Sequence, residues 1–129
     1  MVDYGITRKL ELSYEDAVEK ITAALKEEGF GILTEIDVKA VLKKKIDVDF
    51  RKYVILGACN PTYSNKALNA EIMIGLLLPC NVIVFENDGG GSTVSVMDPG
   101  IMTKLIDNPE LGEVAKEVRE KLERALNSI

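Results

Sequence analysis

The C-terminal segment of the chain carries the pattern that most restricts its fold. Asn108 followed by Pro109 predicts the start of a helix, because asparagine caps a helix and proline fits its first turn. The apolar residues that follow form one stripe along that helix: Leu111, Val114, Ala115, Val118, Leu122, Ala125, Leu126 and Ile129. Away from the stripe, Glu117 and Lys121 are spaced for an ion pair. A stripe of this length needs an apolar partner, and a β-sheet is the only predicted element large enough.

The rest of the chain predicts that sheet and its shorter helices. A helix is expected to begin after Ser13 and end at Gly29, and shorter helices are expected over residues 38–46 and after Pro61. Strands are expected over residues 3–12, 30–38, 52–58, 80–86 and 93–98. The third and fourth strands are nearly continuous apolar runs, so we expect them to be buried on both faces.

The order of these elements favours an α+β fold. Strands and helices do not alternate strictly, which disfavours a doubly wound parallel sheet. We expect a mostly antiparallel sheet covered by the first and last helices, in a single domain spanning residues 1–129. The glycine run at residues 89–91 precedes a strand, so it predicts a hairpin and not a phosphate-binding loop.

Composition and charge disfavour several classes of function. The net charge of −5 disfavours binding to DNA or RNA. No apolar run approaches the roughly 20 residues of a membrane span, and the N-terminal residues lack the apolar core of a secretion signal. A cytoplasmic location without membrane association is therefore expected. The chain has two cysteines and no histidine, which removes the commonest metal ligand and the usual base for a nucleophilic cysteine.

Both cysteines occur in similar short segments. GACNP covers residues 57–61 and PCNV covers residues 79–82, so each cysteine is followed by asparagine and lies near a proline. Cys59 follows the third expected strand, and Cys80 begins the fourth. Antiparallel pairing places the end of one strand beside the start of the next, whereas a parallel βαβ unit separates them. The direction of pairing therefore decides whether the two thiols share a site.

The segments FGILTEIDV, KYVILGACNP and LLLPCNVIVFE, together with the pair Asp98-Pro99, resemble the prokaryotic family called domain of unknown function 302. The resemblance runs from about the first helix to the hairpin. It implies a β-α-β4-α order of helix-grip type, in which an antiparallel sheet curls around the C-terminal helix. It also implies that the third and fourth strands are antiparallel neighbours, which places both thiols at one rim of the sheet. Some relatives form homodimers, and the family brings no established reaction.

Three interpretations of the Cys-Asn segments remain open. In the first, both cysteines are small buried hydrophobic residues, and the asparagines satisfy backbone groups of the turns. In the second, Cys59 and Cys80 act together as a redox couple or as ligands of a soft metal. In the third, Asn60, Asn81 and Tyr63 are polar groups at the mouth of a small-molecule pocket between the sheet and the last helix.

These observations favour a non-catalytic binding or assembly module over an enzyme. Its expected ligand or thiol site consists of Cys59, Asn60, Tyr63, Cys80 and Asn81. The alternative is a thiol-dependent redox protein or a soft-metal-binding protein that uses the two cysteines. The expected partners are a small-molecule ligand and a second copy of the chain, and neither a cofactor nor a metal site is predicted. No residue spacing identifies a catalytic group.

Overall fold

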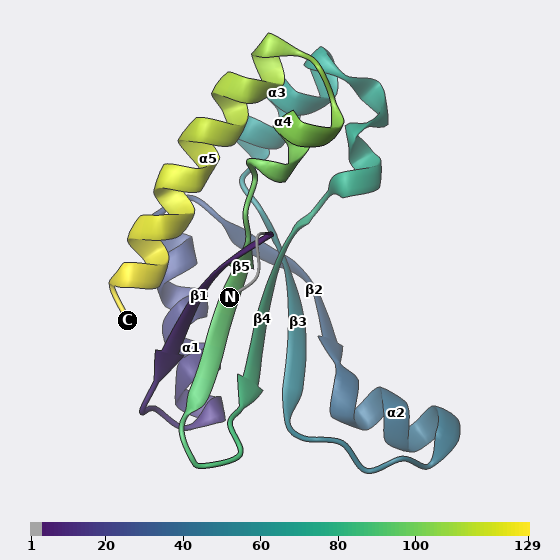
Figure 1. Cartoon of the computed structure of the whole chain (residues 1–129), viewed down its shortest axis with the longest axis vertical. Coiled ribbons are helices and arrows are strands. Elements are labelled where there is room, and N and C mark those ends of the chain that lie inside the picture. The colour runs from purple at the N-terminus through teal and green to yellow at the C-terminus, as the bar shows by residue number, and fades with distance from the viewer. Residues whose placement is uncertain (1–3) are drawn as a thin grey trace.

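The computed structural model describes residues 4–129 and shows one sheet with helices beside it and at its ends (Figure 1). The strands are β1 (Gly5–Leu10), β2 (Gly31–Asp37), β3 (Tyr53–Cys59), β4 (Cys80–Glu86) and β5 (Ser92–Met97). The helices are α1 (Tyr14–Glu27), α2 (Val38–Ile46), α3 (Pro61–Ala70), the 3-10 helix η1 (Ile72–Leu77), α4 (Ile101–Leu105) and α5 (Pro109–Asn127). The first expected strand included Asp3, which lies outside the described residues.

The strands within residues 4–129 form one five-stranded sheet in the order β1-β5-β4-β3-β2. Every neighbouring pair is antiparallel, which confirms the predicted antiparallel sheet. The pairing of β3 with β4 places Ala58 opposite Cys80. In β2 the register shifts between Ile32 and Thr34, so Leu33 lies in a bulge at the edge of the sheet.

Helices α1 and α5 cover one face of the sheet, here called the inner face. The start of α1 is capped by the Ser13 hydroxyl, which accepts a hydrogen bond from the Asp16 amide, and Asn108 caps α5 in the same way. The sheet contributes these fully buried side chains to the shared core: Val54, Leu56, Val82, Val84, Val94 and Val96. Each such side chain contributes roughly 1.5–3 kcal/mol when removed from water. No helix within residues 4–129 is long and apolar enough to cross a lipid bilayer.

The apolar stripe of the last helix packs as the sequence predicted. Seven of its eight residues are buried, from Leu111 at the first turn to Leu126 at the last, and Ile129 is half-buried. Arg8 on β1 donates hydrogen bonds to the backbone carbonyls of Leu126 and Ile129, which ties the end of α5 to the sheet. The expected long C-terminal helix packed on a sheet is therefore confirmed.

The sheet is not strongly curled. The family resemblance implied a helix-grip fold with a curled sheet, and that part of the expectation is wrong. Helix α1 contacts β4 and β5, and α5 contacts α1 and β5, so the two helices lie beside each other (Figure 1). Two neighbouring helices need a broad face, whereas a curled sheet makes a groove for one helix. The coarser description holds, because the fold is α+β with an antiparallel sheet and a long C-terminal helix packed on it.

The opposite face of the sheet, here called the outer face, has no helix packed on it within the described residues. The expectation that β3 and β4 are buried on both faces is therefore wrong. Burial alternates along these strands, so Val54 and Val84 are buried while Ile55 and Phe85 are half-exposed. Successive side chains of a strand point to opposite faces, and helices cover only one of them here.

Candidate functional site

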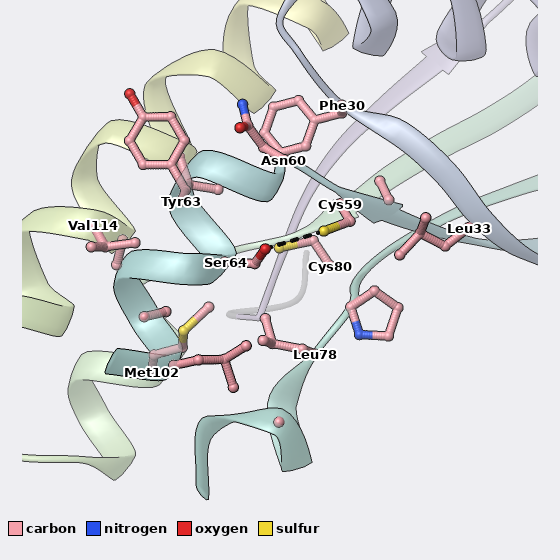
Figure 2. A pocket seen from close by; sticks show the side chains of 17 residues that line it. Phe30, Leu33, Cys59, Asn60, Tyr63, Ser64, Leu78, Cys80, Met102 and Val114 are labelled. Carbon is pink, nitrogen blue, oxygen red and sulfur yellow. Dashed lines mark hydrogen bonds between the residues drawn. The ribbon is translucent and has the colours of Figure 1, made fainter. Parts of the chain in front are cut away.

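A cavity of about 370 Å³ lies at the end of the sheet where β3 ends and β4 begins (Figure 2). It is bounded by these strand ends, by Leu33 of β2, by side chains from α3, α4 and α5, and by the backbone of η1 at Gly75. Seventeen residues line it. Only Asn60, Tyr63 and Ser64 among them carry a side-chain oxygen or nitrogen. The cavity is therefore an apolar space with a few polar groups.

Small residues on three different elements explain why this space is not filled. Ala58 on β3, Ala67 on α3 and Ala115 on α5 are all almost completely buried and all line the cavity. Protein interiors are normally packed without voids larger than a water molecule. Three facing alanines leave room that leucine or isoleucine fills elsewhere in this core.

The two cysteines both line the cavity, at the rim that the antiparallel pairing of β3 and β4 creates. Both thiols are free, so they are not joined in a disulfide. Cys80 is buried, and its removal from water, with a smaller effect of the nearby Cys59, raises the pKa of its thiol to about 11. Cys59 is half-buried, and its Sγ lies 3.3 Å from the Ser64 hydroxyl (Figure 2).

The asparagines of the two segments have different surroundings. The Asn60 amide lines the cavity and donates a hydrogen bond of 3.3 Å to the backbone carbonyl of Glu28. Gly29 makes this approach possible, because a Cβ at its φ of +90° would lie 2.9 Å from the Asn60 nitrogen. Asn81 does not line this cavity. It is exposed on the outer face, because Cys80 before it faces inward and side chains alternate along β4.

Tyr63 also lines the cavity, and two lysines that the sequence analysis did not assign to a site lie over its ring. The Nζ atoms of Lys66 and Lys121 are 5.3 Å and 5.9 Å from the ring centroid. The expected ion pair between Glu117 and Lys121 is not among the ion pairs of residues 4–129. The i, i+4 spacing pointed to a partner on the same helix, whereas the lysine contacts a residue of α3.

The structure therefore brings together four of the five site residues expected from the sequence, namely Cys59, Asn60, Tyr63 and Cys80. Apart from Tyr63 on α3, the walls contributed by α3, η1 and α4 were not predicted, because no motif marks apolar residues that face a cavity. Residues 4–129 hold no group of three or more cysteine, aspartate or glutamate side chains arranged around a common metal position. A thiol with a raised pKa is mostly protonated at neutral pH, and the thiolate is the reactive form. The geometry thus suits enclosure of an apolar group better than chemistry at Cys80.

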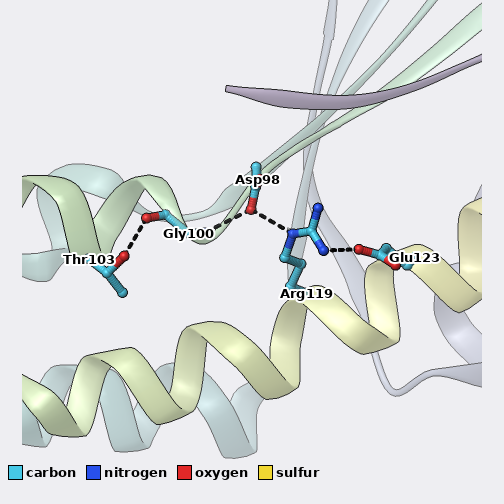
Figure 3. Close-up of polar contacts among 5 residues, drawn as sticks. All are labelled: Asp98, Gly100, Thr103, Arg119 and Glu123. Carbon is cyan, nitrogen blue, oxygen red and sulfur yellow. Dashed lines mark hydrogen bonds and ion pairs between the residues drawn. The ribbon is translucent and has the colours of Figure 1, made fainter. Parts of the chain in front are cut away.

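A second polar cluster surrounds Asp98, from the Asp98-Pro99 pair that contributed to the family resemblance (Figure 3). Its carboxylate accepts hydrogen bonds from the Gly100 amide at 2.9 Å and from the Arg119 guanidinium at 3.1 Å. Arg119 also forms an ion pair with Glu123, and the Thr103 hydroxyl donates to the Gly100 carbonyl. These groups satisfy one another, so the cluster fixes the turn from β5 into α4 against α5.

Comparison with known proteins agrees with this architecture. A family model described as "Domain of unknown function DUF302" matches residues 6–129. The crystal structure of an uncharacterized conserved protein DUF302 from Bacillus stearothermophilus is similar over 98% of this chain and 98% of that chain, with a TM-score of 0.89 and 28% sequence identity. No protein with a curated description matches the chain. Because the family model covers nearly all of it, the chain belongs to the DUF302 family.

Proposed function

We propose that this protein is a non-catalytic module that binds a small, largely apolar molecule in the cavity at the end of the sheet. The observation that carries this proposal is the cavity itself, with its volume of about 370 Å³ and its apolar wall. Ligand pockets in proteins typically measure about 300–1,000 Å³ and have mostly apolar walls with a few converging polar groups.

Water is a poor occupant of this cavity. The volume corresponds to on the order of ten water molecules, each of which needs two to four polar partners. Only Asn60, Tyr63 and Ser64 offer side-chain partners, and the Asn60 amide already donates to the Glu28 carbonyl, so most of this water is bonded only to other water and is weakly held by the wall. Poorly bound water is displaced favourably by an apolar group. An apolar ligand therefore gains free energy by entering.

Binding can be tested with the small neutral fluorophore 1-naphthylamine, whose emission moves to shorter wavelength in apolar surroundings and whose size is within the volume of the cavity. The chain has no tryptophan, so the background signal is low. We expect saturable binding by the wild-type protein and its loss in Ala67→Leu, because leucine fills the cavity from α3. Ala23→Leu, at an exposed position of α1, is the matched control and should bind like the wild type. If Ala67→Leu binds the fluorophore as the wild type does, then the fluorophore binds outside the cavity and the proposal is wrong.

A second function, self-association through the outer face of the sheet, is favoured by the position of the aromatic residues. The Tyr53 and Phe85 rings are stacked there with centroids 5.4 Å apart, and Phe50 lies 6.2 Å from Tyr53. A trough of about 760 Å³ on this face is lined by Tyr4 and Phe85, among others. Four of the chain's seven aromatic residues thus lie on a face that no helix covers.

The occupant that fits this face is a second copy of the chain. The strand dimensions give the outer face roughly 450 Å² in projection. The neighbouring helix α2 has no buried residue, and it leaves Val41 and Ile46 exposed. Together these surfaces approach the roughly 800 Å² per partner of a standard interface. An isologous dimer covers both copies of the face at once.

Light scattering after gel filtration tests this assembly. We expect the mass of a dimer for the wild type and of a monomer for Phe85→Glu, which introduces a charge into the outer face. Lys20→Glu, an exposed position on α1, makes a larger change in net charge away from this face and should stay dimeric. A wild-type monomer at all concentrations tested would reject the assembly.

A further inference from the structure

We infer that the cavity's ligand is an amphiphilic anion, with an apolar body enclosed at the end of the sheet and a carboxylate held at the mouth by Lys66 and Lys121. This inference rests on the proposed function, because it names the chemical class of the molecule that the cavity binds. The observation that supports it is that the ammonium groups of Lys66 and Lys121 both lie over the ring of Tyr63, which lines the cavity.

The two cations come from different helices and meet at Tyr63. Lys66 lies one turn after Tyr63 on α3, and Lys121 reaches the same ring from α5. Tyr63 is half-buried and lines the cavity, so its ring is shared between the apolar interior and the charged exterior. An aromatic face attracts a cation and tolerates apolar contact on its other atoms. Neither lysine lines the cavity itself, so we place both ammonium groups at its entrance and not inside.

Neither lysine has an acidic partner among the ion pairs of residues 4–129. The nearby Arg124 differs, because its guanidinium is held by the Glu28 carboxylate at 3.0 Å. Five of the 16 lysine and arginine residues form ion pairs within residues 4–129, so the lack of a partner is not what distinguishes Lys66 and Lys121. What distinguishes them is that both lie over the ring of one residue of the cavity wall. A ligand carboxylate supplies the missing anion, since its charge is attracted to both ammonium groups.

The dimensions of the cavity limit the apolar body. At about 30 Å³ for each non-hydrogen atom of a liquid, the cavity holds on the order of ten such atoms. A medium-length alkyl chain or a small aromatic ring system fits this limit, and a long-chain lipid does not. The head group remains outside the apolar walls, because burying an unpaired carboxylate is strongly unfavourable. The predicted class is therefore a short amphiphilic monocarboxylate.

Three linear molecules with ten carbons each and different head groups test this inference: decanoate, decan-1-ol and decylamine. Each is titrated into the protein, and its binding is measured by the displacement of 1-naphthylamine. Two charge interactions at the protein surface are expected to make decanoate bind about tenfold more tightly than decan-1-ol. Decylamine should bind more weakly than the alcohol, because its charge is repelled. The preference for decanoate should fall as salt is added, since the ammonium groups are at the surface.

The double variant Lys66→Gln/Lys121→Gln should lose the preference for decanoate and keep the affinity for decan-1-ol, which also shows that it is folded. The double variant Lys44→Gln/Lys45→Gln changes the charge equally on α2, at the other end of the molecule (Figure 1), and should keep the preference. Equal binding of acid and alcohol by the wild type overturns the inference and leaves the proposed function standing. A preference that persists in Lys66→Gln/Lys121→Gln also overturns it. Failure of all three molecules to bind overturns both.

Discussion

Cys59 and Asn60 are at the point where the chain leaves β3, whereas Cys80 and Asn81 are at the point where it enters β4. Beyond the strand, the Asn60 amide is free to turn back and donate to the Glu28 carbonyl. Within β4, the alternation of side chains sends Asn81 to the outer face and leaves it exposed. The asparagines of two near-identical segments therefore have different contacts, because one segment lies at the end of a strand and the other at the start of one.

The thiols differ for the same reason. Cys80 lies opposite Ala58 in the pairing of β3 with β4 and faces the core, so it is buried and its thiol has a raised pKa. Cys59 is the last residue of β3 and is half-buried beside the Ser64 hydroxyl. The shared cavity does not make the two thiols equivalent. Three measurements test these differences between the two Cys-Asn segments.

The largest expected difference is in the rate of alkylation. A thiol with a pKa of about 11 is ionised in roughly one molecule in 10⁴ at neutral pH, and only the thiolate reacts. Burial further restricts access of the reagent to Cys80. We expect iodoacetamide to modify Cys80 about 100-fold more slowly than Cys59 in the native protein, as measured by mass spectrometry of the two peptides. The two should react at similar rates in urea, and rapid native labelling of both would contradict the comparison.

The second prediction concerns stability in alkali. The Cys80 thiol has its ordinary pKa near 9 in the unfolded chain and about 11 in the folded protein. Between these values the unfolded chain binds fewer protons than the folded one, so the free energy of unfolding falls as pH rises. This contribution is fully present below pH 9, and its loss approaches about 2–3 kcal/mol as pH rises through 11.

Urea unfolding at several pH values measures this loss. Tyr14, Tyr53 and Lys52 also have raised pKa values and titrate in alkali, so the wild type is compared with Cys80→Ala. The free energy of unfolding of the wild type should fall more steeply than that of Cys80→Ala between pH 9 and pH 11. Parallel curves for the two proteins would show that Cys80 does not carry the effect.

The sequence predicts the elements of this fold well, because local signals specify them. Ser13 and Asn108 cap α1 and α5 as expected, and the stripe of α5 identifies the face that packs. The antiparallel pairing of β3 with β4 was implied by the family resemblance and is present in the structure. It brings Cys59 and Cys80 to one cavity.

The sequence does not predict which face of a strand receives a helix. The apolar runs of β3 and β4 are typical of strands covered on both sides, yet the structure covers only the inner face. Asn81 is expected from the sequence to be a polar group at the mouth of the pocket, with Asn60 and Tyr63, but the alternation within β4 places it on the outer face. The position of Lys121 over the Tyr63 ring depends on the packing of α5 against α3, and no local sequence pattern predicts that packing.

The smallest expected effect separates the two asparagines. Asn60→Ala removes the donor to the Glu28 carbonyl and should lower the free energy of unfolding by about 1 kcal/mol. Asn81→Ala removes an exposed side chain and should change it by less than about 0.5 kcal/mol. Urea unfolding at two protein concentrations shows whether the cost of each substitution depends on association. If Asn81→Ala is as costly as Asn60→Ala, and the cost grows with protein concentration, then a second copy covers the outer face, because only an interface makes stability depend on association.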